Sequence, residues 1–242
     1  EVTAIQTSVQ ELLDTSNIYS SAVSVTNAST LDAALALGNK LNILNSSLTI
    51  TATTSMDMAK VQTLVDRVFT MTGTLSYTGA SATGTEITFD KLTSAANIDV
   101  DQAFGYSFKA LASAQTVNLR TTYTTTITNV DLGALASATT VNNGTANTIS
   151  FPSATNIDLG SLTRYGASLT IAMKKGGTLD IASLDDVDAA GAQSALALDI
   201  TGPSTLTITK LDGYGGSLAL TNVATASVTD YNAVVTVNGN VD

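Results

Sequence analysis

The side chains that most enzymes use for nucleophilic and acid–base chemistry are largely missing from this chain. Its 242 residues include no histidine and no cysteine, which excludes Ser-His-Asp and Cys-His catalysis and the usual zinc sites. Glycoside hydrolysis needs only two carboxyl groups, about 5 to 9.5 Å apart. The densest acidic set, however, lacks the histidine and basic residues found in polysaccharide-cleaving β-helices. We therefore interpret it as a solvated corner and predict a protein without catalytic residues. The set is Asp180, Asp185, Asp186 and Asp188.

Two acidic groups are candidate calcium sites, because Ca²⁺ prefers six to eight oxygen ligands. One consists of Asp99 and Asp101, and the other of Asp185, Asp186 and Asp188. The chain has neither an EF-hand loop nor a glycine-rich calcium repeat. Solubility is the alternative role for these aspartates, and we expect no cofactor other than Ca²⁺.

A spaced apolar pattern repeats along most of the chain. In residues 130 to 141 the apolar side chains fall at offsets 0, 2, 5, 8 and 11, and similar patterns begin at intervals of 19 to 27 residues. Offsets 0 and 2 place two side chains on the same face of a strand, and a period in the twenties is typical of stacked repeats. This predicts a mainly β right-handed β-solenoid with irregular turns. The repeats begin at Ile87, Tyr106, Val130, Ile157, Leu179 and Leu206, and the residues between the inward pairs, including Ser107, Asp131, Asp158 and Asp180, should face water.

In residues 146 to 171 the pattern does not decide which residue begins the repeat. Both Ile149 and Ile157 resemble the start of a repeat, and a step of eight positions from one to the other is too short for a full turn.

The repeat phrases resemble those of receptor L-domains and related irregular leucine-rich repeats of bacterial and fungal surface proteins. The phrases are LeuThrIle at 169 to 171 and LeuThrSerAlaAlaAsnIleAspVal at 92 to 100, and the likeness extends over roughly residues 46 to 238. The resemblance implies an extracellular, non-enzymatic protein used for structure, adhesion or recognition. Because eukaryotic members usually have disulfide-capped ends, the absence of cysteine favours a prokaryotic relative.

The N-terminal part differs from the repeats because its pattern is helical. Residues 1 to 16 predict an amphipathic helix that caps the first layer. Ser29 or Thr30 should begin a second helix that ends at Gly38, and residues 58 to 68 predict a third. We therefore expect a helical cap and first turn over residues 1 to 45, followed by one continuous repeat domain over 46 to 242. The apolar face of the first helix comprises Val2, Ile5, Val9, Leu12 and Leu13.

The composition of the chain argues against two kinds of partner, nucleic acid and a membrane interior. A net charge of −10 argues against nucleic acid, which requires clustered basic residues. No apolar run approaches the roughly 18 residues that a membrane span needs. Only 12% of the residues are charged, where about 25% is usual, and such uncharged polar surfaces are common on secreted β proteins.

The C-terminal strand suggests what this protein does. Val234, Val235 and Val237 lie in a segment without charge or proline, although natural proteins normally protect exposed strand edges with one or the other. We predict a self-associating, extracellular structural protein of a surface layer, matrix or filament, which binds itself or other surface components. The alternative is an adhesin or glycan-binding module, with Tyr123 and Tyr231 as the free aromatic rings.

Overall fold

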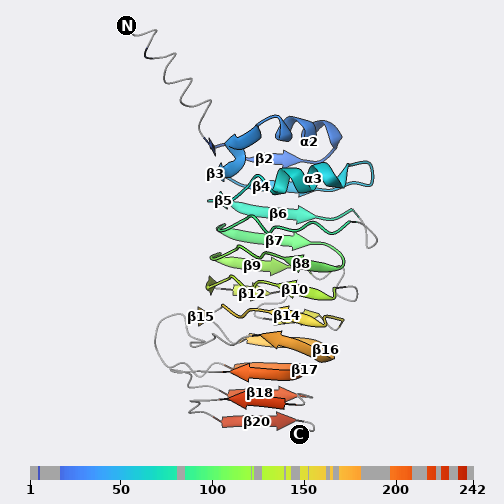
Figure 1. Cartoon of the computed structure of the whole chain (residues 1–242), viewed down its shortest axis with the longest axis vertical. Helices are drawn as coiled ribbons and strands as arrows, with labels where there is room; N and C mark the ends of the chain where they lie inside the picture. The colour runs from blue at the N-terminus through green and yellow to red at the C-terminus, as the bar shows by residue number, and fades with distance from the viewer. Residues whose placement is uncertain are drawn as a thin grey trace.

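The computed structural model arranges the chain as a thin stack of parallel strands (Figure 1). The N-terminal elements lie at one end of the stack and β20 (Val234–Asn238) lies at the other. All strand pairs in the described residues are parallel, as expected for strands joined by crossover connections. The structure describes residues 5, 17–80, 85–120, 122, 127–138, 140–142, 148–151, 153–161, 164–165, 169–180, 197–208, 217–221, 225–228 and 234–238.

One sheet runs along one side of the stack, and each strand pairs with the next in sequence along that sheet. Its inward positions form columns of apolar residues, so that Leu75, Ile98, Val117 and Val141 stack in register. These side chains are buried, and their burial in a shared core is the main stabilising contribution. The strands are β2 (Val23–Val25), β4 (Leu48–Thr51), β6 (Thr74–Thr78), β7 (Asn97–Asp101), β9 (Thr116–Leu119) and β12 (Thr140–Asn142).

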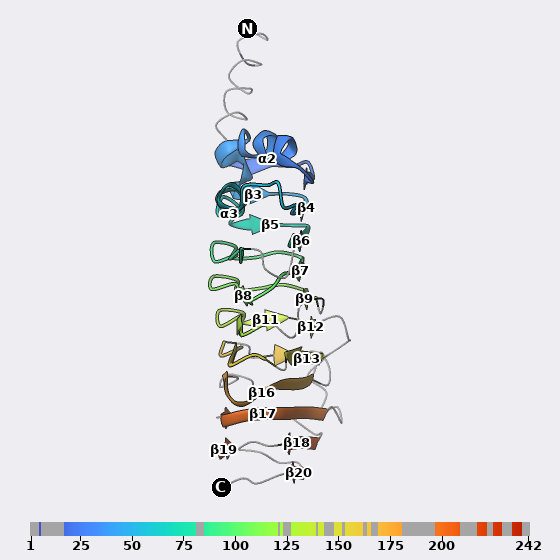
Figure 2. The same cartoon turned by 90° about the vertical axis from the view of Figure 1, so that its right-hand side faces the viewer.

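A second sheet starts near the middle of the stack and continues to its C-terminal end (Figure 2). Tyr106, Val130, Ile157 and Leu179 pair in register through it and are buried. Its strands are β8 (Gly105–Ser107), β10 (Asn129–Asp131), β13 (Thr148–Phe151), β14 (Asn156–Asp158), β16 (Leu169–Asp180), β17 (Ala197–Ile208), β18 (Ser217–Thr221), β19 (Thr225–Val228) and β20.

The third sheet consists of two-residue strands in two described pieces. One piece is β1 (Ile18–Tyr19), β3 (Ile43–Leu44) and β5 (Thr70–Met71), and the other is β11 (Ser137–Ala138) and β15 (Arg164–Tyr165). Single bridges from Thr70 to Ser94 and from Ser94 to Ser113 extend the first piece.

Two α-helices and a 3₁₀-helix lie in the connections of the N-terminal part. α2 (Ala28–Leu35) and η1 (Gly38–Asn42) connect β2 to β3, and α3 (Met58–Val65) connects β4 to β5. The N-cap of α2 is Asn27, whose side chain accepts a hydrogen bond from the backbone N–H of Thr30. The Thr30 side chain in turn accepts from the N–H of Asn27, so the prediction of Ser29 or Thr30 as the cap is wrong by two or three residues. The predicted helix over residues 1 to 16 lies outside the described residues except for Ile5, which is helical.

The predicted right-handed β-solenoid is wrong as an account of this architecture, although the mainly β character is supported in part. The structure has three parallel sheets with few helices, an α/β-like arrangement. In the N-terminal part, helices lie in the connections from β2 to β3 and from β4 to β5, which join strands of two different sheets. In the C-terminal part, β16 and β17 run for twelve residues each, far longer than the inward pairs at offsets 0 and 2 of the repeat pattern. The step between paired residues also varies more than predicted, from 17 residues (Leu218 to Val235) to 29 (Ile171 to Ile200).

The long strand β16 explains the ambiguous register. Ile149 on β13 pairs with Ile171, and Ile157 on β14 pairs with Leu179, so both isoleucines face the same strand at different points. Ile149 and Ile157 therefore belong to two different short strands, which pair with different parts of one long strand.

Candidate functional site

The predicted self-association residues occupy the last strand of the second sheet. Val234, Val235 and Val237 belong to β20, which pairs with β18 from Val234–Ser217 to Asn238–Thr221. Within the described residues β20 has no partner on its other side. The strands β18, β19 and β20 contain no charged residue and no proline. The structure thus places the three valines together on an edge strand that lacks the usual protection against strand pairing.

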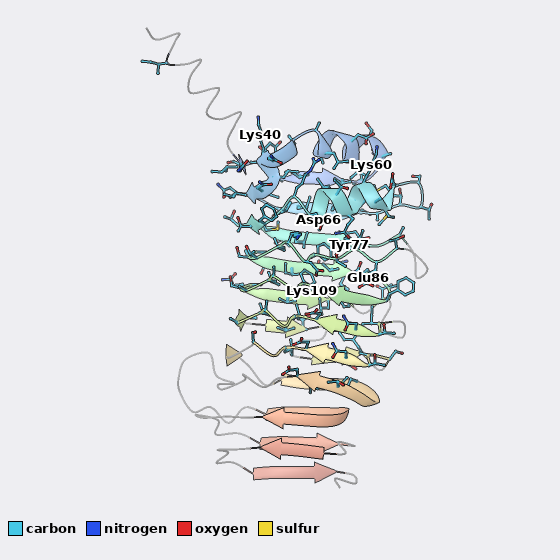
Figure 3. The ribbon with its side chains drawn as sticks, viewed as in Figure 1. Lys40, Lys60, Asp66, Tyr77, Glu86 and Lys109 are labelled. Atoms are coloured by element: carbon cyan, nitrogen blue, oxygen red, sulfur yellow. The ribbon has the colours of Figure 1, made fainter. Side chains whose placement is uncertain are left out.

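The opposite end of the stack is covered by a helix. α2 packs against β2 and α3, and in Figures 1 and 2 it lies beyond the N-terminal strands. Asp32 on α2 forms an ion pair of 2.7 Å with Lys60 on α3, labelled in Figure 3. The two ends of the stack are therefore chemically different.

An exposed apolar patch lies beside this covered end, and the sequence reasoning missed it. Ile18 and Ile43 pair in register on β1 and β3, and they are 45% and 39% exposed. Phe69, 40% exposed, donates its backbone N–H to the carbonyl of Asn42, next to Ile43. The signal was available, because Ile43 and Leu44 are consecutive apolar residues on a strand and only one of them can face the core. We call Ile18, Ile43 and Phe69 the apolar patch.

The predicted calcium ligand Asp99 already has a cationic partner. Its carboxylate accepts hydrogen bonds from Nε and Nη2 of Arg120 and, at 3.0 Å, from Nδ2 of Asn118. These contacts raise the pKa of Arg120, mainly through the hydrogen bond to Asp99. The arrangement is a cross-strand ion pair between β7 and the residue following β9, and it occupies the oxygens that a calcium ion would need.

The second predicted ligand, Asp101, lies on the same strand but is only 5% exposed. Its Oδ1 is buried and accepts no hydrogen bond from the described residues. Burial, and then the charge of Asp101, raises the pKa of Tyr106, whose hydroxyl donates to the backbone carbonyl of Arg120 at 2.9 Å. No group of three or more acidic residues positioned for a metal ion occurs in the part of the chain the structure describes. Asp185, Asp186 and Asp188 lie outside it, so calcium binding there stays a prediction.

A different set of aspartates stacks on neighbouring strands. Asp131, Asp158 and Asp180 pair in register on β10, β14 and β16. Oδ1 of Asp158 accepts the backbone N–H of Gly160 at 2.9 Å, and a Cβ atom at Gly133 would lie 2.7 Å from its Oδ2. Asp180 therefore belongs to this column, whereas the other members of the predicted acidic set lie outside the described residues. Gly133 and Gly160 leave room for the carboxylates of Asp158 and Asp180, which is a structural role.

Ser107 was expected to face water beside this column, but it is buried. The reason is Asp90, which accepts a 2.7 Å hydrogen bond from the Ser107 hydroxyl and whose Oδ2 lies 3.3 Å from Nζ of Lys109. The carboxylate of Asp90 thus replaces the water that would otherwise solvate Ser107.

The pKa of Glu86 is raised from its ordinary value, whereas the pKa of Asp90 is lowered. Burial, reinforced by the charge of Asp90, raises the pKa of Glu86. Burial also acts to raise the pKa of Asp90, but hydrogen bonds from Ser107 and the backbone N–H of Lys109, together with the charge of Lys109, lower it overall. Figure 3 shows Glu86 and Lys109 at neighbouring levels of the stack. Such divergence accompanies acid–base catalysis in enzymes, yet Asp90 is held here by contacts of a structural kind.

The comparisons with known proteins identify no family. No known protein family matches the chain, and no curated protein or solved structure matches it either. The likeness to receptor L-domains therefore stays a prediction. None of the helices in the described residues is long and apolar enough to span a membrane.

Proposed function

We propose that this chain is a non-enzymatic, extracellular structural protein that self-associates into a surface layer, matrix or filament. The observation that carries the proposal is the uncharged edge of β20 at one end of the stack. An edge strand presents unpaired N–H and C=O groups to any strand that approaches it. A second copy of the chain is the partner always present at matching concentration.

Growth beyond a dimer requires two different surfaces on each copy, because a contact that does not close on itself produces an open array. The apolar patch supplies a second surface, since its three residues are exposed near the other end of the stack. Exposed apolar groups of this kind often mark protein–protein contacts.

The surface composition supports the extracellular setting and dense packing of copies. Only 12% of residues are charged, so few like charges oppose the approach of a neighbour. Outward positions are instead occupied by hydrogen-bonded polar residues, as where Nδ2 of Asn156 donates to Oδ1 of Asn129 at 3.0 Å.

Light scattering and negative-stain microscopy of the purified chain test this proposal. We expect mass to increase with concentration and extended or layered particles to appear, with and without Ca²⁺. Thr236→Lys places a charge in the middle of β20 and should abolish assembly. The matched control is Thr49→Lys on β4, which already has β2 and β6 on either side, and it should assemble as the unmodified chain does.

A monodisperse monomer at high concentration would overturn the proposal. Equal loss of assembly in Thr49→Lys and Thr236→Lys would show that β20 is not the contact, because the same charge would then act without regard to position.

A further inference from the structure

The first and last strands on one side of the stack are β2 and β20, which lie near its two ends in Figure 1. On this side β2, β4, β6, β7, β9 and β12 pair in order, and β12 contacts β13. The ladder continues from β13 through the first halves of β16 and β17 to β18 and β20. Within the described residues, neither β2 nor β20 has a strand on its outer side. Two strand edges therefore face outward at opposite ends of one ladder.

The outer edge of β2 opens into an uncharged groove. Val23 donates its backbone N–H to the carbonyl of Ser47, beside β4. Because successive residues of a strand direct these groups to opposite neighbours, the N–H and C=O of Ser24 are directed away from β4. Ser24 is exposed and lines a groove between β2 and α2, which we call the end groove. Its lining, which also includes Tyr19 and Leu37, contains no charged residue.

The sequences of the two edges match. β2 (Val23–Val25) reads Val-Ser-Val, and residues 235 to 237 of β20 read Val-Thr-Val. Within the stack, Leu48 pairs with the first valine of β2, and Leu218 pairs with the first valine of the second triplet. A β20 strand added to β2 of another copy would repeat this internal step, with valine beside valine and threonine beside serine. The register that buries the apolar column would thus be retained across the contact.

The helices of the N-terminal part lie on the other side of the stack. α2 and α3 follow strands of the β2 sheet and precede strands of the third sheet, as β8 and β10 do in later turns. Gln62 on α3 exchanges two hydrogen bonds with the backbone of Thr88. The next residue, Phe89, donates its N–H to the carbonyl of Ser107 on β8. The helices are therefore stacked above β8, and α2 leaves the outer edge of β2 beside it.

The C-terminal end has a corresponding step. On the side of β8 and β10 the last described strand is β19, which pairs with the second half of β17. On the side of β2 the ladder extends past β18 to β20. Among the described strands, β20 therefore lies one layer beyond β19. This step faces the same way as the step between β2 and α2, so α2 of a second copy would lie opposite β19.

We propose that copies of this chain stack head to tail, with β20 of one copy added as a parallel strand to β2 of the next, in the end groove. The inference rests on the proposed self-association and names the surface that receives β20. Neither β20 nor the end groove contains a charged residue, so the contact buries no unpaired charge. Because the two surfaces differ, each added copy leaves one of each free, and the assembly is an open filament.

Blocking one end at a time tests the contact. Ser24→Lys places a charge on the receiving edge, and Thr236→Lys places one on the donated edge. Each variant alone should sediment as a monomer in analytical ultracentrifugation, with the circular dichroism spectrum of the unmodified chain. An equimolar mixture should form a dimer and nothing larger, because the first variant still offers β20 and the second still offers β2. Thr49→Lys on β4, which has strands on both sides, is the matched control and should assemble normally.

Cysteine cross-linking tests the register, because the chain has no cysteine of its own. Neighbouring strands lie about 4.8 Å apart, within the reach of a disulfide, whose Cα atoms are at most about 7 Å apart. We expect copies with Ser24→Cys to form disulfide-linked dimers with copies carrying Thr236→Cys, and neither variant to form them alone. The control mixture of Thr49→Cys with Thr236→Cys should form none.

The outcomes separate this inference from the proposed function. Disulfides between two Thr236→Cys copies would show that β20 pairs with β20. Normal assembly of Ser24→Lys would show that the N-terminal end is closed, as the helix predicted over residues 1 to 16 would make it. Either result overturns head-to-tail stacking and leaves self-association standing. An unmodified chain that stays monomeric at high concentration overturns both.

Discussion

The two ends of the stack differ in how their outermost strand is covered. At the N-terminal end, α2 packs against β2 and is fixed by a capping box and by the ion pair of Asp32 with Lys60. At the C-terminal end, β18 and β20 pair over five residues without a charged side chain in either strand. Specific side-chain contacts hold the helix at one end, whereas at the other end β20 pairs on one side only within the described residues. The two ends of the stack are therefore not equivalent as contact surfaces.

The largest expected loss of stability comes from a substitution at a tightly packed position in the N-terminal part. A Cβ atom at Gly73 would lie 2.5 Å from the backbone carbon and oxygen of Ser46. Because backbone atoms cannot move aside, Gly73→Ala should lower the free energy of unfolding by about 3 kcal/mol. Urea denaturation followed by circular dichroism measures this loss.

Gly38→Ala is the matched control for that experiment. Gly38 has a φ of +59°, and a Cβ atom added there would have no other atom within 4 Å. Only the left-handed backbone is therefore penalised, by about 1 kcal/mol. If the two alanine variants were equally stable, the close backbone contact at Gly73 would not be what limits substitution there.

A smaller effect is expected in the middle of the stack, where the obstacle is a side chain. Gly133→Ala brings Cβ to 2.7 Å from Oδ2 of Asp158, and the carboxylate must move, at about 1 to 2 kcal/mol. Asp158→Ser should relieve most of this loss in the double variant, and thermal denaturation of the three variants measures the coupling. Additive losses would contradict the contact.

The helix cap at the closed end should contribute about 1 kcal/mol. Asn27→Ala removes the acceptor for the Thr30 backbone N–H, so the variant should unfold at a lower urea concentration. Asn27→Ser retains a side-chain oxygen and should recover most of the difference. If alanine and serine were equally destabilising, the cap would not be what fixes α2.

The smallest effect is a dependence on pH. The pKa of Glu86 is raised above its ordinary value of 4.5 in the folded chain, so the folded state binds more protons than the unfolded state above pH 4.5. Stability should therefore fall as the pH rises from 4.5 through the raised pKa. Glu86→Gln should remove this decline, as measured by urea unfolding across the pH range. The lowered pKa of Asp90 acts in the opposite sense, because its stabilisation is lost as the pH falls below 3.8.

The sequence by itself specified which residues face the core in the repeats. Tyr106, Val130, Ile157 and Leu179 were predicted as equivalent starts, and they pair in register. Strand side chains alternate with a period of two, so the inward face is determined by neighbouring residues alone. The same local logic places helices near residues 28 to 35 and 58 to 65.

Only the tertiary structure decided how these elements combine. Three contacts join residues about 17 to 22 positions apart in the sequence. They are the pairing of β13 and β14 with the one strand β16, the hydrogen bond of Asp90 with Ser107, and the ion pair of Arg120 with Asp99. The exposed positions of Ile43 and Phe69 depend in the same way on which strands surround them. Periodicity depends only on residues that are close in sequence. Cross-strand partners depend instead on the lengths of the connections, which are unequal. A single shift in register changes every cross-strand contact, so these partners cannot be predicted from periodicity.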